Sequence, residues 1–222
     1  MFQKISNKSI KIKFFSKIFF IQNNINTIDF SLLKEFDKKQ LLIPNQTHST
    51  NVVFSNKPGQ IHNCDGVFTA NPSVVCLIKV ADCMPIFFAH QDISFYGVVH
   101  AGWKGLTKGI LKNTSILFFK HKLKFNEIDI FIGPSIQKCC FEISMDIVDQ
   151  FPPWSIKSKS SGKFMVNLQK IAFEELRAMG FNKNRIKISV DCSFCKKNDY
   201  YSYRRDGKET GRMIGLIGNK DW

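Results

Sequence analysis

Short apolar runs, separated by polar segments that contain Gly, Pro, Asn or Asp, are the dominant pattern along this chain. The runs are a few residues long and rich in Val, Ile and Phe, as strands bounded by turns are. Ile214–Ile217 predicts a last strand near the end of the sequence. The other predicted strands are Lys11–Phe15, Ile18–Gln22, Asn51–Phe54, Gly66–Thr69, Val74–Lys79, Ile86–Ala89, Phe95–His100, Ile128–Ile132 and Lys187–Asp191.

Apolar residues at helical spacing are less common, so fewer helices are predicted. The longest is Leu106–His121, which follows a glycine-bounded turn. The others are Met145–Phe151 with Ser144 as N-cap, Leu168–Met179 with Asn167 as N-cap and Gly180 as stop, and a short helix at Ser31–Phe36. Because the helices fall between groups of strands, the pattern predicts sheets covered by helices, in a single α/β or α+β layered domain over residues 1–222.

The composition is that of an ordinary globular protein, with 44% hydrophobic and 23% charged residues. A core of that size needs no disulfides, so the seven cysteines are interpreted as reduced thiols. The basic, apolar start is interrupted by Lys17 and lacks a small-x-small cleavage site, which favours strands over a signal peptide. No stretch approaches the roughly 18 apolar residues of a membrane span, so a cytoplasmic location and no membrane partner are expected.

A formal net charge of +14 raises the question of nucleic-acid binding. The lysines are scattered along the chain, whereas a dedicated nucleic-acid binder usually clusters its basic residues. Lys, Phe, Ile and Asn are all abundant and all have AT-rich codons, so a biased genome explains the charge. No nucleic-acid partner is therefore expected.

Three residues that can bind a soft metal, His48, Cys83 and His100, each lie where an apolar run ends. Side chains at strand ends are held rigidly and can face a crevice. Two imidazoles and a thiolate are three of the four ligands of a tetrahedral zinc site, and a fourth position left to water is typical of catalytic zinc. Spacing alone leaves Cys83 open as either a nucleophile or a ligand.

The neighbours of these residues suggest a cleft. Gln46 would share a face with His48 if the segment is extended. Asp82 beside Cys83 indicates that the chain emerges there at a surface or a cleft. The turn after His100, Ala101-Gly102-Trp103-Lys104-Gly105, predicts a helix start that attracts anions, and Lys104 would add to that field.

Two further groups of residues have an open interpretation. Cys192-x-x-Cys195 has metal-ligand or redox spacing, but no second C-x-x-C completes a zinc knuckle, and packing is expected for the adjacent Cys139-Cys140. Arg204, Arg205 and Arg212 are three of only five arginines. Their forks suit planar or phosphate groups, and an internal salt bridge with Asp206 or Glu209 is an equal alternative.

These residues add up to a resemblance. Gln46-x-His48, CDGVFT, VADCMPIFF, VVHAGWKG, IGPSIQKCCFEI, DCSFC and YYSYRRDGKETGRMIG occur in this order between Asn45 and Ile217. Together they look like the laccase-domain family, which has been called multicopper polyphenol oxidase, peptidoglycan-editing factor and purine nucleoside phosphorylase. The segment FFSKIFFIQNNINTIDF is shorter than the family's usual start and lacks its Gly-Gly loop, and Lys17 stands near the family's usual arginine.

The resemblance implies a four-layer α/β/β/α domain with mixed sheets and a zinc site made by His48, Cys83 and His100. It also implies phosphorolysis of adenosine, inosine and S-methyl-5'-thioadenosine, with deamination of adenosine as a second activity. The partners would be purine nucleosides and phosphate, and the chain would be a monomer or a weak homo-oligomer. Zinc is the expected metal, with copper as the second choice.

Within that function, Cys83, His100 and Asp82 are the expected catalytic residues. The expected substrate-binding residues are Gln46, Asp65, Lys104, Arg204 and Arg205. One alternative is a cysteine-type amide hydrolase that acts in peptidoglycan precursor editing, with Cys83 as nucleophile and His100 as base. Another is a copper polyphenol oxidase, although one Cys and two His are too few ligands for a multicopper cluster.

Overall fold

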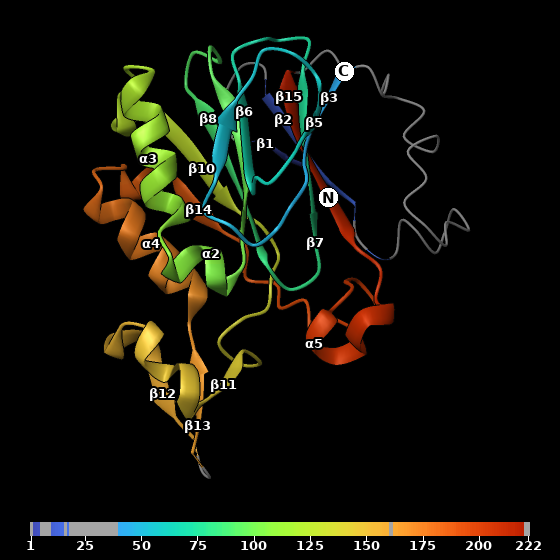
Figure 1. Ribbon diagram of the computed structural model, residues 1–222, viewed down its shortest axis with the longest axis vertical. Coiled ribbons are helices and arrows are strands. Elements are labelled where there is room, and N and C mark those ends of the chain that lie inside the picture. Colours follow the sequence, from blue (N-terminus) through green and yellow to red (C-terminus); the bar gives the residue numbers. More distant parts are fainter. Residues whose placement is uncertain (1, 5–9, 16, 18–39, 160–161, 220–222) are drawn as a thin grey trace.

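The structure, a computed structural model, describes residues 2–4, 10–15, 17, 40–159 and 162–219 (Figure 1). The predicted strand Ile18–Gln22 and the predicted short helix Ser31–Phe36 lie outside the described residues. Two six-stranded sheets and one three-stranded sheet make up the strand framework. Among the described residues, no helix combines the length and the apolar character that crossing a membrane requires.

The first sheet is mixed and has the order β1-β2-β15-β7-β3-β5. The last strand of the chain, β15, pairs antiparallel with both β2 and β7, while β3 pairs parallel with β7 and β5. The bounds are β1 Phe2–Lys4, β2 Ile10–Phe15, β15 Met213–Asn219, β7 Val75–Val80, β3 Leu41–Pro44 and β5 Gly59–Ile61.

The second sheet is also mixed and has the order β14-β10-β8-β9-β6-β4. Its outer pairs, β10 with β14 and β4 with β6, are parallel, and its inner pairs are antiparallel. Every residue of β8 and β9 is buried, as in strands covered on both faces. The bounds are β14 Ile186–Ile188, β10 Ile128–Ile132, β8 Met84–His90, β9 Tyr96–Ala101, β6 Gly66–Thr69 and β4 Val52–Phe54.

The two large sheets pack against each other through one apolar cluster. It joins Ile78 and Ile217 of the first sheet to Phe87 and Val98 of the second. The approach is close, because a Cβ at Gly215 would lie 2.6 Å from the ring of Phe87. This packing places the ends of strands from both sheets side by side, where the candidate site lies.

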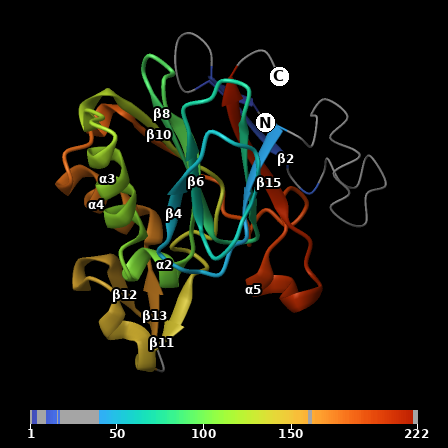
Figure 2. The same cartoon turned by 45° about the horizontal axis from the view of Figure 1, so that its top comes forward.

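Helices cover the other face of the second sheet (Figures 1 and 2). They are α2 Trp103–Thr107, α3 Ile110–Lys120 and α4 Leu168–Ala178. The predicted single helix Leu106–His121 is wrong in its continuity, because Gly109 adopts a left-handed φ of 93° between α2 and α3. Glycine adopts that conformation without steric cost, so the chain can turn there.

The predicted N-caps have different outcomes. The side chain of Asn167 accepts a hydrogen bond from the Lys170 N–H at 3.0 Å and begins α4 as predicted. Ser144 makes no such bond; its hydroxyl donates to the Asp146 carboxylate instead. The segment that it precedes, Met145–Gln150, is a 3-10 helix and not the predicted α-helix.

A small third sheet at one end of the molecule was not predicted (Figure 2). Its order is β11-β13-β12, with bounds Glu142–Ser144, Lys163–Val166 and Ile156–Ser158. The remaining short elements are α5 Tyr203–Asp206 and the 3-10 turns Phe125–Glu127, Pro153–Ser155, Lys183–Arg185 and Gly207–Glu209.

The predicted fold class is confirmed as mixed α/β. Every predicted strand within the described residues is present, with ends that match the prediction or are shifted by up to a few residues. The largest shift is at β14, which ends at Ile188 and leaves Asp191 in the following loop. Three of the expected layers are described, namely the helices α2 to α4 and the two large sheets, and the second helical layer stays a prediction.

Candidate metal centre and its cavity

The structure brings His48, Cys83 and His100 together. Their ligand atoms all lie within 4.8 Å of one another. The imidazole rings of His48 and His100 are nearly perpendicular, with centroids 4.8 Å apart. His48 lies between β3 and β4 and Cys83 between β7 and β8, so both lie where the chain passes from the first large sheet to the second. His100 comes from β9, so packing of the two sheets assembles the cluster.

Asp65 fixes the loop that carries His48. It is fully buried, and its carboxylate accepts the backbone N–H groups of Thr47, His48 and Ser49 at 3.1, 3.0 and 2.7 Å. His48 has a left-handed φ of 59°, which is uncommon for a residue with a side chain. Three hydrogen bonds to a charged acceptor offset that strain. The backbone therefore bends at His48, and both Gln46 and His48 face the cavity described below.

The same carboxylate orients His100. Nδ1 of His100 lies 2.7 Å from Oδ1 of Asp65, so this nitrogen carries the proton and Nε2 is left for Cys83 or a metal. Burial alone would raise the pKa of Asp65, but the hydrogen bonds from His100 and Ser49 hold it well below its usual range. Asp65 does not line the cavity. The structure thus gives Asp65 a positioning role, and its contact with substrate stays a prediction.

Cys83 and His100 shift each other's protonation. Burial would raise the pKa of Cys83, yet the neighbouring imidazoles of His100 and His48 lower it to about 6. Burial would lower the pKa of His100, yet the Cys83 thiolate and the Asp65 carboxylate raise it to about 9. A thiolate beside an imidazolium is therefore the favoured state when no metal is bound.

Gly102 leaves the space that the cluster needs. A Cβ at Gly102 would lie 2.9 Å from Sγ of Cys83 and 3.2 Å from Cδ2 of His48. The donor set of one thiolate and two imidazoles suits zinc, and Asp65 supplies the outer carboxylate that metal-bound histidines usually have. The residues present therefore fit a zinc ion.

A cavity of about 1220 Å³ adjoins the cluster. Its wall includes the expected residues Gln46, Asp82, Lys104 and Arg204 as well as the three donors. The basic side chains of its lining are Lys79, Lys104, Lys108, Arg204 and Arg212. Within the described part of the chain, Asp82 is the one carboxylate of the lining, so the cavity suits an anionic ligand.

Gln46 and Asp82 have structural partners. The amide of Gln46 pairs with the backbone of Lys79, donating to its oxygen at 2.8 Å and accepting from its nitrogen at 3.0 Å. The carboxylate of Asp82 accepts from the hydroxyls of Ser193 and Ser202 and from the Arg204 N–H, at 2.6, 3.0 and 2.7 Å. Both oxygens of Asp82 thus hold the chain that leads into α5, and its expected catalytic role stays a prediction.

The two neighbouring arginines differ. Arg204 lines the cavity, and its guanidinium lies 5.2 Å from the Phe141 ring centroid. The guanidinium also donates to the backbone oxygen of Glu142 at 2.7 Å. Arg205 does not line it. Its guanidinium pairs with Asp206 at 2.7 Å and donates to the backbone oxygens of Ser193, Phe194 and Tyr200. The internal alternative is thus correct for Arg205, and its contact with substrate stays a prediction.

The helix after His100 is too short for the expected anion site. The helix α2 has five residues, and its N-cap Gly102 provides no side-chain cap. Lys104 nevertheless lines the cavity, with Nζ 5.7 Å from the Trp103 ring centroid. The positive charge expected at this wall therefore comes from side chains and not from a helix dipole.

Several cavity residues were not expected as binding residues. Lys79, Lys108, Tyr201 and Arg212 line the wall and come from separate parts of the sequence. Arg212 could have been included, because it belongs to the same concentration of arginines as Arg204. The others carry no local signal, since only the folded chain brings them to one wall.

Comparison with known proteins places this geometry in a family. The model of the multi-copper polyphenol oxidoreductase laccase family matches residues 21–220. A purine nucleoside phosphorylase of Haemophilus influenzae is 34% identical over 180 residues, which cover 78% of this chain and 71% of that protein. Purine nucleoside phosphorylase YlmD of Bacillus subtilis is 32% identical over 165 residues, which cover 71% of this chain and 59% of that protein.

The three-dimensional likeness agrees. The crystal structure of YlmD from Geobacillus stearothermophilus superposes with a TM-score of 0.82 at 25% identity, covering 90% of this chain and 82% of that one. The resemblance that the ordered motifs indicated is thereby confirmed at the level of the family. On the family match and the 34% identity together, the chain belongs to the multi-copper polyphenol oxidoreductase laccase family.

Proposed function

We propose that the protein is a zinc-dependent purine nucleoside phosphorylase acting on adenosine, inosine and S-methyl-5'-thioadenosine, with adenosine deaminase as a second activity. The observation that carries the proposal is the position of the donors: His48, Cys83 and His100 converge beside a basic cavity. Relatives named as purine nucleoside phosphorylases support the same choice.

The three donors would hold the zinc, and Asp65 would fix the tautomer of His100 by accepting from its Nδ1. When bound, zinc supplies a Lewis acid that can polarise a water molecule or a substrate oxygen. This hydrogen bond to Asp65 holds the imidazole ring of His100 in one orientation, with Nε2 available to the metal. Gly102 keeps the space beside Cys83 and His48 clear.

Phosphorolysis needs a phosphate held close to the sugar. A phosphate oxygen forms a bond to C1′ while the bond from C1′ to the purine nitrogen breaks, and the purine gains a proton. Lys104, Lys108, Arg204 and Arg212 surround the cavity and would neutralise the phosphate. They would also lower the cost of bringing its charge next to the nucleoside.

Aromatic side chains in the cavity lining could contact the purine base. Trp103, Phe141, Tyr201 and Tyr203 all line the cavity. The ring of Tyr201 lies so close to Gly211 that a Cβ there would approach its ring atoms to 2.6 Å. Flat faces of this kind accept a planar base by stacking. In deamination, the oxygen of water adds to the purine carbon that bears the amino group, and ammonia leaves.

One observation favours a second candidate, the cysteine-type amide hydrolase. Cys83, His100 and Asp65 form a line of hydrogen-bonded side chains, in which the carboxylate orients the imidazole and the imidazole contacts the thiol. Such a line activates a cysteine nucleophile in other enzymes. His48 has no task in that mechanism, whereas a metal site uses it, and this favours the phosphorylase. For the copper oxidase, one thiolate and two imidazoles remain fewer donors than a multicopper cluster needs.

The test is direct. Purified protein is incubated with adenosine, inosine or S-methyl-5'-thioadenosine, with and without phosphate and with and without a chelator. We expect free purine and the sugar 1-phosphate only when phosphate is present, ammonia from adenosine, and loss of both activities with chelator. The variant His48→Ala should lose them too. His62→Ala, an exposed histidine outside the cavity lining, is the matched control and should keep them.

Two outcomes would overturn the proposal. Absence of both products from fully metal-loaded protein would remove the nucleoside function. Activity that survives chelation and His48→Ala but is blocked by covalent modification of Cys83 would establish the hydrolase mechanism instead.

A further inference from the structure

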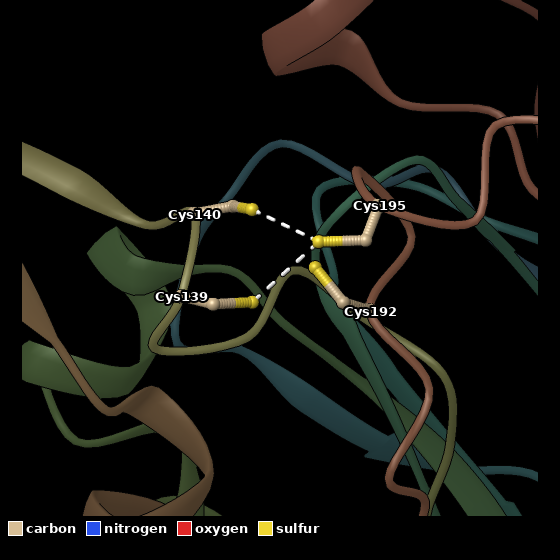
Figure 3. A group of neighbouring side chains, drawn as sticks. All are labelled: Cys139, Cys140, Cys192 and Cys195. Atoms are coloured by element: carbon tan, nitrogen blue, oxygen red, sulfur yellow. Dashed lines mark hydrogen bonds between the residues drawn. The ribbon is translucent and has the colours of Figure 1, made fainter.

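Four cysteines outside the cavity form a second cluster of possible metal donors (Figure 3). Cys139 and Cys140 come from the turn before β11, and Cys192 and Cys195 come from the turn after β14. Their four sulfurs lie within 4.8 Å of one another. All four are free thiols in the structure. The side chains of the two turns point toward one another across the gap between them.

The spacing of the sulfurs suits a metal ion. Sulfurs bound to zinc at about 2.3 Å in a tetrahedron lie roughly 3.8 Å from each other. The sulfur of Cys195 lies 3.7 Å from that of Cys139 and 3.3 Å from that of Cys140. A disulfide would require about 2.05 Å. These two sulfur–sulfur distances are therefore close to those of a zinc tetrahedron, and both are too long for a disulfide.

We propose that Cys139, Cys140, Cys192 and Cys195 form a second, structural zinc site that joins these two turns. Zinc would replace the thiol protons, which pass to solvent, and four thiolates would fill its coordination shell. No position is then left for a substrate, as is typical of structural zinc. The adjacent pair Cys139-Cys140 takes the place of the second C-x-x-C whose absence argued against a zinc site in the sequence.

The two turns are held together by groups other than the cysteine sulfurs. Ser135 and Cys192 form an isolated parallel bridge, and the Ser193 N–H donates to the Ser135 oxygen at 3.1 Å. The side chain of Gln137 donates to the backbone oxygens of Ser189 and Asp191. Since this framework does not depend on the sulfurs, the site is prepared before a metal binds.

Individual contacts also suit thiolate ligands. The backbone N–H of Gln137 points at Sγ of Cys192 at 3.4 Å, the kind of donor that stabilises a negatively charged sulfur. Arg205 also holds the second turn, by donating to the backbone oxygens of Ser193 and Phe194. Cys192 is 6% exposed, while Cys139 and Cys195 are exposed, so an ion can enter from solvent.

The site would stiffen one wall of the cavity. Ile136 and Phe141, which line the cavity, lie on either side of the Cys139-Cys140 turn. Ser193, inside the C-x-x-C turn, donates to Asp82, the neighbour of Cys83, at 2.6 Å. Binding of zinc at the four cysteines would therefore restrain residues that border the first cluster without adding a ligand to it.

The test counts metal ions in protein without a metal-binding tag, prepared anaerobically with zinc and then freed of loosely bound metal. Wild-type protein should hold about two zinc ions per chain by elemental analysis. Cys195→Ser and Cys139→Ser, both at exposed positions, should each hold about one, and His48→Ala should also hold about one. Cobalt loaded into His48→Ala should show the strong thiolate-to-cobalt absorption and tetrahedral spectrum of a four-sulfur site, which the Cys195→Ser variant should lack.

Three results would overturn the second site. The first is a single zinc per wild-type chain that disappears in His48→Ala and stays in Cys195→Ser. The second is paired disulfides among these cysteines in anaerobically prepared wild type, found by mass spectrometry. The third, which decides the question even if the serine variants fail to fold, is wild-type protein whose cobalt spectrum lacks the four-thiolate signature. Retained zinc at this site with no nucleoside activity would count only against the proposed function.

Discussion

The substitution Gly102→Ala tests the geometry of the candidate metal centre by adding a single methyl group. It lies at the start of α2 with a φ of −70°, which alanine adopts without strain. The backbone therefore permits Gly102→Ala, and only the new Cβ matters. That atom would meet Sγ of Cys83 at 2.9 Å and Cδ2 of His48 at 3.2 Å, both nearer than ordinary van der Waals contact. Two of the three donors must move by several tenths of an ångström.

The expected magnitude follows from packing and from coordination. Inserting a methyl group into a filled site typically lowers the free energy of unfolding by about 1–3 kcal/mol. Metal–ligand distances tolerate shifts of about 0.2 Å, so displaced donors should also weaken zinc binding. We expect a loss of affinity of about 10–100-fold, comparable to the loss of an outer-shell partner. Competition with a chromogenic chelator measures the affinity, and urea unfolding of the metal-free protein measures the packing cost.

A second substitution separates the clash from helix capping, because glycine is also a better N-cap than alanine. Gly102→Ser supplies a capping side chain and adds the same Cβ. If the clash is the cause, the serine variant binds zinc as weakly as the alanine variant. Recovery of affinity in Gly102→Ser, or wild-type affinity in Gly102→Ala, would refute the reasoning.

Three further changes have defined outcomes. Asp65→Asn removes the charge that orients His100, so zinc affinity should fall about 10–100-fold in chelator competition; unchanged affinity would contradict the positioning role. Burial raises the pKa of Glu175 to about 7, above its usual 4.5, so the folded protein keeps this proton longer than the unfolded chain and stability falls as pH rises between those values. Glu175→Gln should therefore gain up to about 3 kcal/mol at about pH 8 and little at about pH 4 in urea unfolding, whereas Glu174→Gln, which breaks a pair with Arg177, should not. Asn167→Ala removes the cap of α4 and should cost about 1 kcal/mol in the same assay, with Asn167→Ser retaining most of the stability.

Most strands of the two large sheets were predictable because their signal is local, whereas β1, β3 and β5 were not predicted. Gly66–Thr69 and Ile128–Ile132 are strands with the predicted bounds, since each is a short apolar run between turn residues. The break at Gly109 was less visible, because a glycine within an apolar pattern can be tolerated in a helix or can end it. Pairing between β11, β13 and β12 depends on residues distant in the sequence, and no periodic pattern predicted it.

The three donors were also identifiable, because each ends an apolar run, and the ordered motifs indicated that they belong together. The four-cysteine cluster was not. C-x-x-C normally pairs with a second C-x-x-C, and the sequence holds two adjacent cysteines instead. Whether adjacent cysteines can converge on a distant pair depends on the bridge between Ser135 and Cys192, which exists only in the folded chain.

Asp65, expected to bind substrate, and Asp82, expected to be catalytic, show why a charge close to a metal donor is an ambiguous signal. The carboxylate of Asp65 accepts hydrogen bonds from three backbone N–H groups and one imidazole. That of Asp82 accepts from two hydroxyls and one backbone N–H. A buried carboxylate is costly unless such donors surround it, and once surrounded it holds distant loops in place. Asp65 positions the loop of His48, and Asp82 positions the chain before Arg204. The acidic residues thus build the frame of the cavity, and its exposed charge is left to lysine and arginine, as an anionic ligand requires.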